Sequence, residues 1–214
     1  MFSQAIALPT LILLSFSSIW LIITTDWRVR LGLLALLYFG EFIFLSLSWP
    51  VSMAVSKLVA GWMAAAVLGM ALISNPTSPT GIGARFKFIG NSKLGFFQYF
   101  RIQPATIFYL IAAILVGLVT FSVSAVFTTW IPDSQEVVIW AGLLVLGLGI
   151  LQLGFRADVF STILGILTMV AGFEIIYASI EHSTLVAGLL AVITLGLALV
   201  GAYLILSPQI EEGE

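Results

Sequence analysis

The chain has 214 residues, of which 61% are apolar and 8% are charged, with a formal net charge of −2. A soluble domain carries about 25% charged residues, and a globular fold of this length cannot bury so much apolar surface. We therefore expect an integral membrane protein with the lipid bilayer as its surroundings and no nucleic-acid partner. The absence of Cys excludes disulfides, thiolate metal sites and cysteine nucleophiles.

Apolar segments of the length needed to cross a bilayer follow one another along the chain. A hydrocarbon core about 30 Å thick takes about 20 residues as helix. Pro residues mark several segment ends, where a missing N–H costs little, and no segment alternates as a β-span does. The first segment lacks the basic start and small-residue cleavage site of a signal peptide. We predict an all-α, polytopic membrane helix bundle of about seven transmembrane helices. The expected spans are about 5–25, 31–48, 54–74, 105–130, 137–155, 159–180 and 184–206.

Basic residues test this count, because successive connections alternate between the two sides of the membrane. We call side A the side that holds the first, third and fifth connections and the C-terminus. Seven of the eight basic residues fall on side A, and Lys57 alone falls on side B. Cytoplasmic faces carry such an excess, which predicts an outside N-terminus, a cytoplasmic C-terminus and the cell's inner (cytoplasmic) membrane. The side-A residues are Arg28, Arg30, Arg85, Lys87, Lys93, Arg101 and Arg156.

One long connection, residues 76–104, divides the chain into a three-helix part (1–75) and a four-helix part with a short C-terminal tail (105–214). Its second half mixes Phe and Tyr with Lys and Arg. Aromatic rings at headgroup depth, with cations toward anionic lipid, are typical of a segment in the cytoplasmic membrane interface. The alternatives are a surface anchor and a docking strip for a partner subunit.

Two acids lie deep in the expected spans. Glu41 is about ten residues into the second span, and Glu174 is about fifteen residues into the sixth. A charge in hydrocarbon costs at least about 2.5–3.5 kcal/mol, so both should face protein or water, or be protonated. Both are candidates for a proton path. The alternative is a neutral carboxyl that hydrogen-bonds two helices together.

Other polar residues near span ends have simpler interpretations. Lys57 is a third candidate for the proton path, and its alternative is a lysine that extends to the membrane surface. Asp158 is expected to cap a helix and to interact with Arg156. The Glu181-His182 pair indicates a solvated turn. We find no nucleotide, metal or catalytic-nucleophile motif, so we expect no catalytic, cofactor or metal residues.

The stretch from Leu144 to Ile176, LVLGLGILQLGFRADVFSTILGILTMVAGFEII, resembles two related membrane subunits. One is chain 4L of complex I, and the other is component E of hydrogenase-4, which is similar in length to this chain. The likeness implies a membrane-arm subunit beside antiporter-like subunits. The intramembrane glutamates of chain 4L, which take part in proton transfer, would fall on Leu167 and near Val192, where this chain has no acid.

These observations favour a subunit of a complex I-like, hydrogenase-like or cation-antiporter-like assembly that scaffolds or supports proton translocation. Such a chain need not be catalytic by itself, although it could be a non-catalytic subunit of a membrane oxidoreductase. The alternatives are a stand-alone secondary transporter and a membrane assembly factor. Against the transporter stands the lack of an inverted repeat and of a pair of broken helices.

Overall fold

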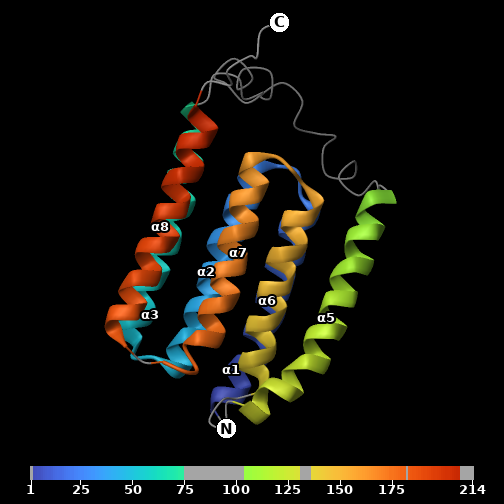
Figure 1. Cartoon of the computed structure of the whole chain (residues 1–214), viewed down its shortest axis with the longest axis vertical. Coiled ribbons are helices and arrows are strands. Elements are labelled where there is room, and N and C mark those ends of the chain that lie inside the picture. Colours follow the sequence, from blue (N-terminus) through green and yellow to red (C-terminus); the bar gives the residue numbers. More distant parts are fainter. Residues whose placement is uncertain (1, 75–103, 131–135, 182, 208–214) are drawn as a thin grey trace, which may run out of the picture.

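A computed structural model describes residues 2–74, 104–130, 136–181 and 183–207 (Figure 1). Seven helices make up these ranges, each long and apolar enough to cross a membrane. The chain is thus a multi-pass membrane protein, and the predicted all-α fold class is confirmed. The helices are α1 (Phe2–Ile23), α2 (Trp27–Ser48), α3 (Val51–Ser74), α5 (Pro104–Trp130), α6 (Glu136–Phe155), α7 (Val159–Tyr177) and α8 (Thr184–Leu206).

Six of the helices form two layers of three, α1-α2-α3 and α6-α7-α8. Each helix of the first layer packs on its counterpart in the second: α1 on α6, α2 on α7 and α3 on α8 (Figure 1). Paired helices run in the same direction, because α5 adds one crossing between the two layers. Residues about 132 positions apart therefore meet at equal depth. Trp49 Nε1, at the end of α2, donates to the carbonyl oxygen of Glu181 at 2.7 Å.

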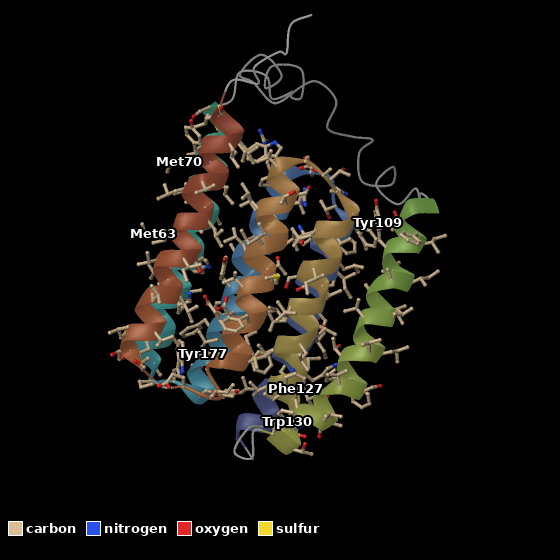
Figure 2. The ribbon with its side chains drawn as sticks, in the orientation of Figure 1. Met63, Met70, Tyr109, Phe127, Trp130 and Tyr177 are labelled. Atoms are coloured by element: carbon tan, nitrogen blue, oxygen red, sulfur yellow. The ribbon has the colours of Figure 1, made fainter. Side chains whose placement is uncertain are left out.

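Helix α5 lies at the edge of the bundle, against α6 and a small part of α1 (Figure 1). Only 11% of its span is buried, compared with 56% for α7. Most of its surface is therefore left for lipid. Its side-B end carries Phe127 and Trp130, which is 81% exposed (Figure 2).

The closest helix contact joins α6 and α7, and glycines make it possible. A Cβ on Gly172 would lie 2.7 Å from Leu146 Cα and from Gly142 O. A Cβ on Gly149 would lie 2.8 Å from Met169 Cα. In lipid, helix association depends on close packing rather than on the hydrophobic effect, so small residues allow the backbones to approach. This contact holds α7 in a fixed position relative to α6.

The structure also corrects one detail of the expected spans. Helix α2 begins at Trp27, four residues before the predicted start, so Arg30 lies inside the helix and is 2% exposed. The sequence pattern predicts Arg30 in the connection between the first two spans. The interpretation of segment 76–104 falls almost entirely outside the described residues, and the assignment of sides to cytoplasm and exterior stays a prediction.

Candidate functional site

Five buried polar side chains converge from four helices. Helix α2 contributes Tyr38 and Glu41, α3 contributes Lys57, α7 contributes Glu174 and α8 contributes Thr194; each is at most 2% exposed. Glu41 lies fourteen residues after the start of α2 and Glu174 fifteen after the start of α7. At 1.5 Å per residue, both carboxyls are roughly 21–22 Å from the side-A ends of their helices. The two acids therefore lie at similar depth, nearer side B.

An ion pair joins α3 to α7 within this cluster. Lys57 Nζ donates to Glu174 Oε1 at 2.6 Å and lies 3.3 Å from Thr194 Oγ1. The Thr194 hydroxyl lies 3.5 Å from the same carboxylate oxygen and 3.0 Å from the carbonyl oxygen of Leu190. A buried ion pair survives desolvation only with good geometry and additional hydrogen bonds. Thr194 supplies the additional hydrogen bonds here.

Glu41 is the second carboxyl of the cluster, and it has no cation of its own. Within the described residues, neither of its oxygens has a hydrogen-bond donor, and Glu174 Oε2 has none. The electrostatic neighbours of the Glu41 carboxyl are the Glu174 carboxyl, which disfavours a charge on Glu41, and Lys57, which favours it. Two carboxylates in contact repel each other, but a proton on either one turns the contact into a hydrogen bond. The net charge of the two acids and the lysine ammonium is therefore zero when the two carboxyls share one proton.

Tyr38 lies on the same face of α2 as Glu41, one turn toward side A. Its hydroxyl has no hydrogen-bond partner among the described residues. Its electrostatic neighbours are the carboxyls of Glu41 and Glu174. Gly61 of α3 provides the space for its ring, because a Cβ there would overlap the ring carbons. The phenol is thus fixed in position beside the two acids.

The structure brings together all three residues that the sequence singled out for a proton path: Glu41, Lys57 and Glu174. Lys57 does not reach the membrane surface, because its ammonium is paired inside the bundle. Sequence reasoning missed Tyr38 and Thr194, which are ordinary residues in an apolar helix.

The sequence does carry one signal for the similar depth of the two acids. Leu31-Gly32 and Leu164-Gly165 are each followed by a Glu nine residues after the Gly. This shared spacing places the two acids at equal depth on two parallel helices.

A second polar cluster lies at side A, where α7 begins. Arg30 Nη1 donates to Ser161 Oγ at 2.7 Å, and its guanidinium carbon lies 5.1 Å from the centre of the Phe160 ring. Asp158 caps α7 by accepting from Ser161 N at 2.9 Å, which confirms the predicted cap. These contacts tie α2 to the start of α7.

The charge of Asp158 is stabilised by this cluster. Burial alone raises the pKa of the Asp158 carboxyl, but hydrogen bonds from Ser161 and the positive charges of Arg30 and Arg156 outweigh burial. The net result is a pKa below the ordinary value of 3.8. Arg156 also donates to the carbonyl oxygen of Ile22 at 3.3 Å, at the end of α1. His182 lies outside the described residues.

Comparison with protein-family models, curated sequences and solved structures gives no match to this chain. Among the described residues, no three His, Asp or Glu side chains gather in a group that could hold a metal ion.

Proposed function

We propose that the chain is a membrane subunit of a proton-translocating assembly of the complex I-like, hydrogenase-like or cation-antiporter-like kind, located in the cytoplasmic membrane. In this proposal the acid pair Glu41–Glu174 is its proton-exchange site. The observation that carries the proposal is the buried cluster of two carboxyls with a single lysine. Intramembrane ionisable residues are costly and are typical of ion pathways and proton relays.

The cluster can hold a proton at a defined place. Lys57 compensates the charge of Glu174 at Oε1, which leaves Oε2 unpaired and able to accept a hydrogen bond from a protonated Glu41. A proton satisfies both carboxyls without the several oxygen ligands that a hard metal cation requires. When the proton leaves, one negative charge stays on the pair, and Lys57 is the nearest cation to either acid. The pair can therefore exchange one proton at a time.

A purified chain reconstituted in liposomes allows a direct test by infrared difference spectroscopy. We expect the carbonyl stretch of a protonated carboxyl at neutral pH, with a shift on transfer to D₂O. Glu41→Gln should remove this band. Glu136→Gln is a matched control, because Glu136 is an exposed acid in the first turn of α6. A wild-type protein without an exchangeable carboxyl band would overturn the proposal.

The assembly itself requires a second experiment. A tagged chain extracted in a mild detergent should migrate as a large complex that contains antiporter-like subunits, identified by mass spectrometry. Vesicles carrying Glu41→Gln or Glu174→Gln should retain the complex and lose most of their proton pumping. Unchanged pumping by both variants, with the complex intact, would exclude a role for the acids in translocation.

A stand-alone secondary transporter is the second candidate. It is favoured by the two parallel three-helix layers with polar residues at their interface, because some transporters bind substrate between parallel repeats. In that case, the mild-detergent extract should contain a lone monomer or small homo-oligomer, and reconstitution of this chain alone should support ion-coupled uptake.

A further inference from the structure

The hydroxyl of Tyr38 is unusual because its ring is fixed in place while its oxygen has no partner. The side chain is 2% exposed, and within the described ranges no group accepts or donates a hydrogen bond at its oxygen. A buried hydroxyl without a hydrogen-bond partner is energetically costly. The ring packs directly on Gly61, where a Cβ would overlap the ring carbon Cγ.

Acceptors are available on one side of this hydroxyl. Glu41 follows three residues later on the same helical face, and Glu174 approaches from α7. The groups that face Glu41 are Tyr38 on its own helix, Lys57 on α3 and Glu174 on α7. Helix α1 also packs on α2 and contains no titratable side chain. Among the described residues, Tyr38 is thus the neutral donor on the same helix as Glu41, whereas the Thr194 hydroxyl lies beside Glu174 Oε1.

We propose that Tyr38 is a positioning residue for proton exchange, and that its hydroxyl donates to the Glu41 carboxylate once Glu41 has lost its proton. This inference rests on the proposed function of the acid pair. In the protonated state, Glu41 donates to Glu174. After the proton leaves, Glu41 lacks a donor, and its carboxylate turns toward the Tyr38 hydroxyl, which supplies one without movement of the ring. Gly61 makes this possible by leaving room for the ring beside α3.

The test measures the pH at which the protonated carboxyl band disappears, in the full chain in liposomes. Tyr38→Phe removes the hydroxyl and keeps the ring, so the ionised form of Glu41 loses a donor. We expect the band to persist to a pH about one to two units higher than in the wild type, as the loss of a hydrogen bond to a charged group implies. A purely structural role for the ring would leave this midpoint unchanged, because phenylalanine fills the same space.

A second pair of variants tests the position of the ring. Gly61→Ala forces the phenol from its place and should also raise the midpoint, although the hydroxyl is present. Gly32→Ala is the matched control on α2, since a Cβ there meets nothing within 4 Å, and it should leave the midpoint unchanged. A band whose midpoint is the same in the wild type and Tyr38→Phe would overturn the role of Tyr38 alone. Absence of the band in the wild type would overturn the proposed function instead.

Discussion

Removal of either partner of the Lys57–Glu174 ion pair should destabilise the bundle, but by different amounts. Lys57→Met leaves Glu41 and Glu174 side by side in the core without a cation. Glu174→Gln leaves Lys57 with Glu41, the spare carboxyl of the cluster, as a substitute partner. Because a second acid is present, we predict that loss of the lysine lowers the unfolding free energy more than loss of Glu174 does.

The size of the difference follows from the burial of the pair. Breaking a buried ion pair from one side costs about 3–5 kcal/mol, and the side chains of Lys57 and Glu174 are 2% and 0% exposed. We expect Lys57→Met to lower the unfolding free energy by about 3–5 kcal/mol at neutral pH. For Glu174→Gln we expect about 1–3 kcal/mol, the cost of imperfect hydrogen bonding. The double variant contains one neutralisable acid and should be less destabilised than the sum of the two.

Reversible unfolding in mixed micelles provides the measurement, with all four proteins compared in a double-mutant cycle. Acidification should rescue Lys57→Met, because protonation of both acids removes their repulsion. Glu136→Gln, at an exposed helix start, should change stability by less than about 0.5 kcal/mol. If Glu174→Gln destabilises the bundle as much as Lys57→Met, Glu41 is not an alternative partner for the lysine.

Other parts of the molecule give independent predictions. Gly172→Ala should destabilise the bundle by about 1–3 kcal/mol because its methyl meets the backbone of α6, whereas Gly188→Ala, with nothing within 4 Å, should be neutral or slightly stabilising in thermal unfolding. Asp158→Ala should cost about 0.5–2 kcal/mol at neutral pH. The folded-state pKa of Asp158 is below 3.8. The stabilisation that Asp158 provides is therefore complete above pH 3.8 and is lost as the pH falls through the folded-state pKa. The unfolding free energies of wild type and variant should thus converge in acid. If side A is cytoplasmic, Lys93→Cys in this Cys-free chain should react with an impermeant thiol reagent from the cytoplasmic side only, and Trp130→Cys from the outside; the reverse pattern would invert the topology.

The number and length of the helices could be predicted from the sequence because lipid imposes one simple requirement, a long apolar helix. The depth of Glu41 and Glu174 followed from the same counting. The pairing of α2 with α7 could not be predicted, because apolar helices offer many nearly equivalent packing faces. For this reason, Lys57 had two interpretations in the sequence; its position opposite Glu174 excludes the extension to the membrane surface, and its role in a proton path stays a prediction.

Arg30 shows the same limit at the other end of the bundle. The charge pattern alone assigned Arg30 to the connection between the first two spans. The structure instead extends α2 by one turn and places the guanidinium between Ser161 and the Phe160 ring. Whether Arg30 is buried depends on Ser161, which is 131 positions away in the sequence and is brought close by tertiary packing.

Helix α5 has a consequence for how freely the sequence can change. After the three helices of the first layer, the chain is on the side of the membrane opposite to where α1 began. A second layer that runs parallel to the first therefore requires one extra crossing, which α5 provides. To cross the membrane in this way, α5 needs only sufficient length and apolar side chains over most of its surface. Neutral drift should therefore be fastest on the outer side of α5 and slowest where α7 carries glycines and an acid, so related sequences should diverge first in the helix that joins the two layers.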